Sequence, residues 1–267
     1  MKSVLGIPDV LVYGIIVALI VSYSKINNRQ KNASKAPQNI GETLPSDSPL
    51  DPSILISIDH PRSGTGTAFA INETGQWLTA RHVVDSCDRI ALKVSNRRFL
   101  PVKAKILKNV DLAILSGDWT RKPIRSDIHT PRFLGEYGFF FGFPQGNPGE
   151  AVGKLLGRGR MKVTGRYRSE EPILAWAESG RSEGLRGSLG GISGGPVLDQ
   201  DGEIIGVVAA ESLRRGRIYT VAPRNLQPVI EEKKSYKARP ISLKSYGLQA
   251  DEYRRNRQIT QVVCLVK

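Results

Sequence analysis

The sequence predicts an all-β domain, because short apolar runs broken by turn residues follow one another from residue 54 to about residue 230. Gly, Asn, Asp and Pro separate these runs, and many short strands at such spacing are typical of antiparallel sandwiches and barrels. Long helical periodicity is absent apart from one predicted turn at residues 80–86. The stretch is long enough for two six-stranded antiparallel β-barrels, which is the fold class we expect.

The apolar runs justify the predicted strands in order. In the first half they read ILISI, GTAFAIN, WLTA, RIALKV, FLPVKAKIL and DLAIL, and in the second half YGFFFGF, PILAWAE, PVLD, EIIGVVAA and RIYTVAP. The stretches NETGQ and DQDGE each predict a tight turn between two strands of a hairpin, because Asn, Asp and Gly tolerate the backbone of such turns.

Residues 4–23 predict an N-terminal transmembrane helix, since twenty residues interrupted only by Pro8 and Asp9 can just cross a bilayer. No small-x-small cleavage site follows, which favours an uncleaved anchor over a signal peptide. The basic residues soon after the span would place the rest of the chain in the cytoplasm. We expect a single-pass anchor over residues 1–24.

Three further regions follow the anchor. Residues 25–52 are polar and punctuated by proline, so they cannot bury enough surface to order themselves and predict a flexible linker. Residues 53–230 hold the predicted β-domain. Residues 231–267 are too few for another full domain and predict a basic C-terminal tail, with nine basic and four acidic side chains.

The net charge of +14 invites a nucleic-acid or acidic-membrane interpretation. Much of the excess lies in segments expected to be linker, loop and tail, including six basic residues and no acid in residues 151–169. No nucleic-acid-binding motif accompanies the charge, so no nucleic-acid partner is expected. Anionic lipid or plain solubility explains the excess as well.

Two cysteines, Cys87 and Cys264, exclude a disulfide-dense scaffold and a multi-cysteine zinc site. They could form one bridge that ties the C-terminal segment to the main domain. They could equally be two buried thiols, and the sequence leaves both possibilities open.

A candidate general base is His82, which directly follows an apolar strand in WLTARHVVDSC. Asp111 opens the apolar run DLAIL, where a partly buried carboxylate needs a hydrogen-bond donor such as an imidazole. Ser193 lies in GGISGGPV, where the glycines allow a sharp bend and backbone amides that point at an anion. These three side chains give the chain order His, Asp, Ser.

Five blocks in this order resemble the chymotrypsin-fold serine endopeptidases, and within them the bacterial HtrA-like (Deg) branch. SGTGTAFAI is similar to that family's opening strand pair, WLTARHVV to its histidine block and VDLAIL to its aspartate block. FFFGFPQG resembles the strand that opens its second barrel, and GISGGPVLDQDGEIIGVV its serine block. The resemblance implies a chymotrypsin-like double barrel. The tail is too short for a PDZ domain of roughly 90 residues.

The resemblance implies a serine endopeptidase that cuts proteins or peptides through an acyl-enzyme. Ser193 would attack, His82 would move the proton and Asp111 would orient His82. The amides of Gly191 and Ser193 would bind the oxyanion, and the chemistry needs no metal or organic cofactor. Because most anchored bacterial relatives act outside the cytoplasm, the protease domain is expected to be periplasmic or otherwise extracytoplasmic, against the charge bias.

Two departures bear on activation and specificity. Ile192 stands where zymogen-type relatives carry an aspartate, so we expect a site that forms without N-terminal cleavage. The specificity pocket is expected to be based on Gly187 and walled by Ala209 and Ala210, with Glu211 at its rim. This set favours small or medium apolar residues, whereas an inward Glu211 would allow a basic one.

An alternative interpretation is a catalytically inactive protease-fold module that binds peptides or partner proteins. The intact set of three polar residues argues against it, since a binding module does not need all of them. The sequence gives no indication of oligomeric state.

Overall fold

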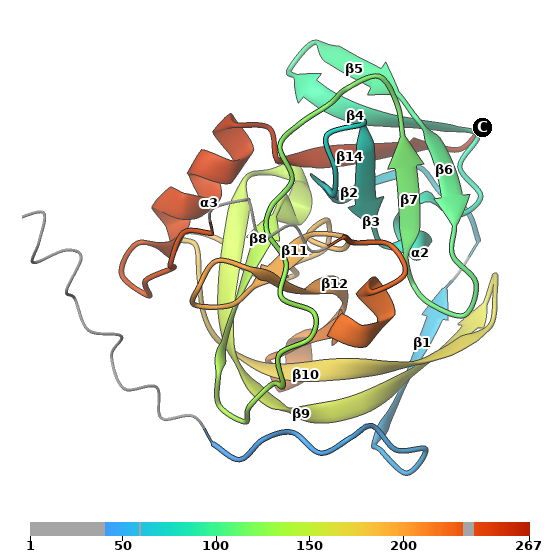
Figure 1. Cartoon of the computed structure of the whole chain (residues 1–267). Coiled ribbons are helices and arrows are strands. Elements are labelled where there is room, and N and C mark those ends of the chain that lie inside the picture. The colour runs from blue at the N-terminus through green and yellow to red at the C-terminus, as the bar shows by residue number, and fades with distance from the viewer. Residues whose placement is uncertain (1–40, 59, 232–237) are drawn as a thin grey trace, which may run out of the picture. The chain divides into compact units, whose positions relative to one another are not determined.

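The protein folds mainly as two seven-stranded β-sheets (Figure 1). The structure, a computed structural model, describes residues 41–58, 60–231 and 238–267. The prediction of a mainly β fold in two parts is confirmed, whereas each sheet has seven strands instead of the expected six. The predicted membrane span at residues 4–23 lies outside the described residues, and among the residues that are described no helix is both long and apolar enough to cross a bilayer.

The first sheet has the strand order β5-β4-β14-β2-β3-β7-β6. Its strands are β2 (Gly64–Ala70), β3 (Gln76–Thr79), β4 (Arg89–Ser95), β5 (Arg98–Pro101), β6 (Lys103–Ile106), β7 (Ala113–Ser116) and β14 (Ile259–Leu265). β5 and β6 lie at opposite ends of this order, but only Val102 separates them in the sequence. They therefore form one bent strand, which joins the two ends of the sheet and closes it into a first barrel. Trp77 and Leu92 are fully buried in its core.

The second sheet has the order β1-β9-β10-β13-β12-β11-β8. Its strands are β1 (Ser53–Ile58), β8 (Tyr137–Gly142), β9 (Gly149–Gly165), β10 (Ser169–Arg181), β11 (Pro196–Leu198), β12 (Ile204–Ser212) and β13 (Arg217–Val221). A further pairing of β8 with β9 closes six of these strands into a second barrel. β1 lies outside the ring and pairs in parallel with β9, so the expectation of purely antiparallel pairing is corrected at this edge.

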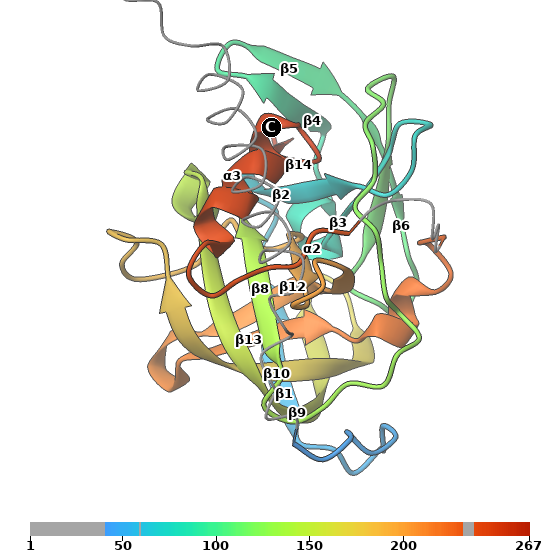
Figure 2. The ribbon, with the colours of Figure 1, turned by 60° about the vertical axis from the view of Figure 1, so that its left-hand side comes forward.

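Short helices connect the strands. They are α2 (Arg81–Val84), α3 (Tyr246–Arg255), η1 (Pro144–Gly146), η2 (Leu213–Arg215) and η3 (Pro223–Leu226). α2 confirms the turn predicted at residues 80–86. Figure 2 shows α3 beside β8 and β14, against which it packs near the junction of the two barrels.

Two segments predicted as loop or tail are regular structure instead. Residues 151–169 fall largely in the hairpin of β9 and β10, because apolar side chains face the core between basic ones that face outward. The described part of the tail, residues 238–267, contributes α3 and β14. β14 is not an appendage, since it pairs with both β2 and β4 inside the first barrel.

The cysteines form a disulfide. Cys87, just after α2, is bonded to Cys264 on β14, with 5.5 Å between the Cα atoms. The bond ties the C-terminal strand to the segment that follows the histidine block, which settles the alternative that the sequence left open.

Candidate active site

The imidazole of His82 is hydrogen-bonded to the carboxylate of Asp111. Nδ1 lies 2.7 Å from Oδ2, and the backbone amide of His82 donates to Oδ1 at 2.9 Å. Strand pairing explains the meeting: Thr79 at the end of β3 is paired with Ala113 at the start of β7. The residues just beyond β3 and just before β7 therefore lie side by side.

The β9–β10 hairpin supplies further partners of Asp111, whose side chain is nearly fully buried. The Tyr167 hydroxyl donates to Oδ1 at 3.0 Å, and the Asp111 amide donates to the Glu171 carboxyl at 2.6 Å. The carboxylate thus accepts three hydrogen bonds, which fix its orientation toward the ring of His82.

Three pKa values are shifted in this cluster. Burial opposes the protonated form of His82, but the charge and hydrogen bond of Asp111 outweigh burial and raise the pKa of His82 above 6.5. Burial raises the pKa of Glu171 to about 8, and the Asp111 charge adds to the shift. Burial and Asp111 also raise the pKa of Tyr167, which keeps its hydroxyl as a donor.

Ser193 lies against the first barrel, in the same cavity as His82 and Asp111. Its carbonyl accepts a hydrogen bond from the amide of Thr67 on β2 at 2.9 Å. The next residue, Gly194, has φ +83°, and a Cβ there would lie 2.3 Å from the Thr67 carbonyl oxygen. Only glycine permits this approach. The cavity has a volume of about 380 Å³ and is lined by all three predicted catalytic side chains.

The predicted oxyanion site lies in the loop before Ser193. Gly191 has φ +98°, and its carbonyl accepts a hydrogen bond from the Thr67 hydroxyl at 2.8 Å, which turns the peptide plane. Within the described residues, neither the Gly191 amide nor the Ser193 amide donates to a protein acceptor. The intervening Ile192 is only 2% exposed and anchors the loop in the core of the second barrel.

The structure separates the four predicted pocket residues. Ala209 lines the cavity with the three predicted catalytic residues, whereas Gly187 is exposed and a Cβ built on it would meet nothing within 4 Å. Ala210 is half-buried on β12. Glu211 is turned toward the loop before the serine, where its carboxylate accepts from the Leu189 amide at 2.8 Å and from the Ser188 hydroxyl.

Sequence reasoning missed the side chains that brace the site, among them Tyr167, Glu171 and Gln145. The Gln145 amide group donates to the carbonyls of Arg186 and Ser188 at 2.6 and 2.8 Å. Gln145 stands in FFFGFPQG, a block that the resemblance includes, but nothing in a single sequence indicates partners 40 residues away.

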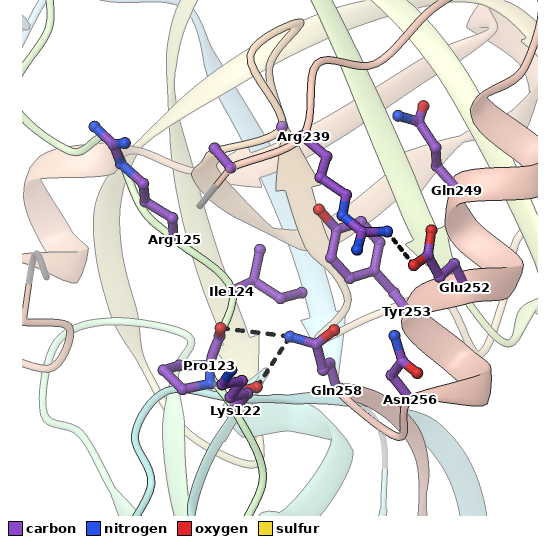
Figure 3. Close-up of a pocket in the computed structure, with 12 residues that line it drawn as sticks. Lys122, Pro123, Ile124, Arg125, Arg239, Gln249, Glu252, Tyr253, Asn256 and Gln258 are labelled. Carbon is purple, nitrogen blue, oxygen red and sulfur yellow. Dashed lines mark hydrogen bonds and ion pairs between the residues drawn. The ribbon is translucent and has the colours of Figure 1, made fainter. Parts of the chain in front are cut away.

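A second pocket and an acidic cluster lie outside the candidate active site. Figure 3 shows a pocket of about 460 Å³ against α3, in which Gln258 donates to the Lys122 carbonyl at 3.0 Å and Arg239 pairs with Glu252. It contains none of the predicted site residues. The acidic group of Asp127, Asp199 and Glu203, with ligand atoms within 4.8 Å of one another, is paired with arginines at 132 and 125.

The chain is similar to known proteins both in sequence and among solved structures. Solved structures to which this chain is similar include an HtrA-type protease, AlgW, with a decapeptide (20% identity, TM-score 0.49, 61% of this chain and 50% of that one). Others are the Rv3671c protease of M. tuberculosis in an inactive form (18%, 0.49, 61% and 80%) and the serine endoprotease from Yersinia pestis (21%, 0.48, 61% and 55%).

The chain spans about half the length of the first of these structures, and comparison with curated proteins gives no match. A family profile described as "Trypsin-like peptidase domain" matches residues 66–207. This match covers more than half of the sequence, includes the histidine, aspartate and serine blocks, and shows that the chain belongs to the trypsin-like peptidase family.

Proposed function

We propose that the protein is a serine endopeptidase in which His82, Asp111 and Ser193 form the catalytic triad. The observation that carries the proposal is the single cavity lined by all three side chains, with the imidazole already held by the carboxylate at 2.7 Å. A nucleophile, a base and a group that orients the base are the parts that acyl transfer requires.

The hydrogen bond to Asp111 determines which ring nitrogen of His82 acts as the base. Because a carboxylate accepts hydrogen bonds, Nδ1 carries the hydrogen in the neutral ring and Nε2 keeps its lone pair. Nε2 takes the proton from the Ser193 hydroxyl as the oxygen attacks the peptide carbonyl, and returns it to the leaving amine. A water molecule then repeats the sequence on the acyl-enzyme.

The backbone amides of Gly191 and Ser193, which donate to no acceptor among the described residues, supply the oxyanion site. Each such donor is worth on the order of 3 kcal/mol of transition-state stabilisation. The loop is held by the buried side chain of Ile192 and by the Glu211 and Gln145 hydrogen bonds. This arrangement supports activity without N-terminal cleavage.

Ala209 supports a preference for small or medium apolar residues on the acyl side of the scissile bond, because it is the predicted pocket residue that faces the triad cavity. Glu211 faces the loop at 188–189 and already accepts hydrogen bonds there. A panel of peptides that differ only at this position tests the preference. Cleavage confined to peptides with Arg or Lys there would assign the Glu211 carboxylate to substrate recognition.

Anchoring through residues 4–23, with the protease domain on the extracytoplasmic side, completes the proposal. The disulfide between Cys87 and Cys264 supports an oxidising compartment, since structural disulfides are rare in reducing cytosol. Accessibility of the domain to added protease in spheroplasts tests the orientation. Protection of the domain would favour the cytoplasmic side that the charge bias indicates.

The test of function is hydrolysis of an unstructured, fluorophore-quenched protein by the wild type, Ser193→Ala and Ser57→Ala. Ser57 also lines the cavity and is the matched control. We expect turnover by the wild type and the control and loss of all but background turnover in Ser193→Ala. A folded wild type that binds the substrate without cutting it would favour the peptide-binding module instead.

A further inference from the structure

A second, strongly basic groove lies next to the candidate active site. It has a volume of about 760 Å³ and is lined by the turn after β4, the end of α3, part of β14 and the loop at residues 143–148. Its cationic side chains include Lys93, Arg97, Arg255 and Arg257.

None of these four cations is paired with an acid in the part of the chain that the structure describes. Among the described residues no carboxylate forms an ion pair with any of them, and Arg97, Arg255 and Arg257 are exposed. The acid that lines the groove, Asp251, pairs with Arg254 at 2.7 Å. Arg254 in turn pairs with the buried Glu150 at 2.7 Å. The groove therefore keeps an uncompensated positive field.

One loop separates the groove from the candidate oxyanion site. Phe143 and Gly146 line the groove, and a Cβ built on Gly191 would lie 2.6 Å from the Phe143 carbonyl oxygen and 3.5 Å from the Gly146 amide. Gly191 also lines the triad cavity. A polypeptide bound across the cavity thus has to travel only past this loop to reach the cations.

We propose that the groove binds an acidic segment of the protein substrate, at a distance of a few residues from the bond that is cut. The proposal rests on the proposed function and names the class of substrate. Exposed charges at this spacing act through attraction and orientation, so the groove lowers KM and speeds association more than it changes the chemical step.

The lining favours an acidic peptide over nucleic acid. Proteins that bind single strands combine basic residues with aromatic side chains on which bases stack. The aromatic side chain in the lining is the half-buried Phe143, on the loop that faces the cavity. A carboxylate-rich peptide needs only the cations.

The experiment uses peptides with one cleavable core and a tail of four glutamates or four glutamines, attached at either end. We expect one of the glutamate tails to lower KM about tenfold relative to its glutamine match, at unchanged kcat. The advantage should shrink in 0.5 M salt because exposed charges are screened. It should also shrink in the double variant Arg97→Gln/Arg255→Gln.

The matched control is Arg89→Gln/Lys105→Gln, which removes two exposed cations of β4 and β6 outside the groove lining. It should keep the advantage of the glutamate tail. Equal KM for both tails, or an advantage that survives in Arg97→Gln/Arg255→Gln, would overturn the groove proposal. Cleavage of the glutamine-tailed peptides would leave the proposed function intact in either case. Oligonucleotides that bind the groove, with no glutamate effect, would assign it to nucleic acid.

Discussion

The ring of His82 connects the electrostatics of the site with its pH dependence. Asp111 raises the pKa of His82 above 6.5, and the proposed triad needs the neutral ring to accept the serine proton. We therefore expect kcat/KM to fall as the pH drops through a value above 6.5.

In Asp111→Asn we expect that limb to move to lower pH and kcat to drop by about ten thousand-fold, because the ring loses its orienting carboxylate. Initial rates between pH 5 and 9 measure both effects. An unshifted limb in the variant would show that Asp111 does not act on His82.

Glu171 makes a separate prediction about stability. Its folded-state pKa of about 8 exceeds the ordinary value of 4.5, so the folded protein binds the proton more tightly than the unfolded chain. The free energy of unfolding should fall as the pH rises from about 4.5 to about 8, by on the order of 1 kcal/mol per pH unit at most.

Glu171→Gln should reduce this loss, while Glu136, whose pKa burial raises to about 7, continues to contribute in the same direction. Urea unfolding of both proteins at pH 5 and pH 8 gives the comparison. Equal losses in the wild type and the variant would exclude Glu171 as the source.

At the residue scale, the sequence was sufficient to predict His82, Asp111 and Ser193 as catalytic candidates but not the groups around them. Each of the three candidates lies beside a strand or turn that local sequence predicts. Tyr167 and Glu171 reach Asp111 only because the β9–β10 hairpin folds over it. No local pattern encodes that long-range contact.

The loop at residues 186–190 leads into the candidate oxyanion site, and Gln145 holds this loop with two hydrogen bonds. Gln145→Ala removes both bonds and releases the loop that they hold. We expect a roughly tenfold fall in kcat/KM with little change in unfolding, since the bonds are exposed.

The comparison variant is Asn147→Ala, which removes a weaker bond of 3.3 Å to the Gln145 carbonyl and leaves the brace in place. Steady-state kinetics on one peptide separates the two variants. Equal kinetic effects in both would mean that the brace contributes nothing specific to the site.

At the element scale, strands with continuous apolar runs could be predicted from the sequence. β9 could not, because charged residues and glycines interrupt its apolar residues. The basic and glycine-rich sequence of β9 resembles a loop because its outward face is solvated. β14 was missed for a different reason. β14 is seven residues long and follows a basic segment, and its own sequence does not indicate that it pairs between β2 and β4.

For the whole molecule, the disulfide and β14 together tie the C-terminal segment to the first barrel. The bond closes a separation of 177 residues, which in the chain-entropy account stabilises the fold by up to about 5 kcal/mol. Cys87→Ser/Cys264→Ser should therefore unfold at markedly lower urea concentration than the oxidised wild type, and at about the same concentration as the reduced wild type.

Urea titrations with and without dithiothreitol give these three midpoints. Coincidence of all three would show that the bond contributes nothing to stability. β14 is hydrogen-bonded to β2 on one side and to β4 on the other, so the disulfide fixes a strand inside the first barrel.

The most direct test of the central claim, that His82, Asp111 and Ser193 act as one catalytic unit, is reaction with a fluorophosphonate followed by mass spectrometry of the labelled peptide. The account predicts a single adduct on Ser193, formed rapidly in the wild type and in Ser57→Ala and strongly slowed in His82→Ala. An adduct-free wild type that is folded and oxidised, or labelling of Ser193 at the same rate in His82→Ala, would contradict it.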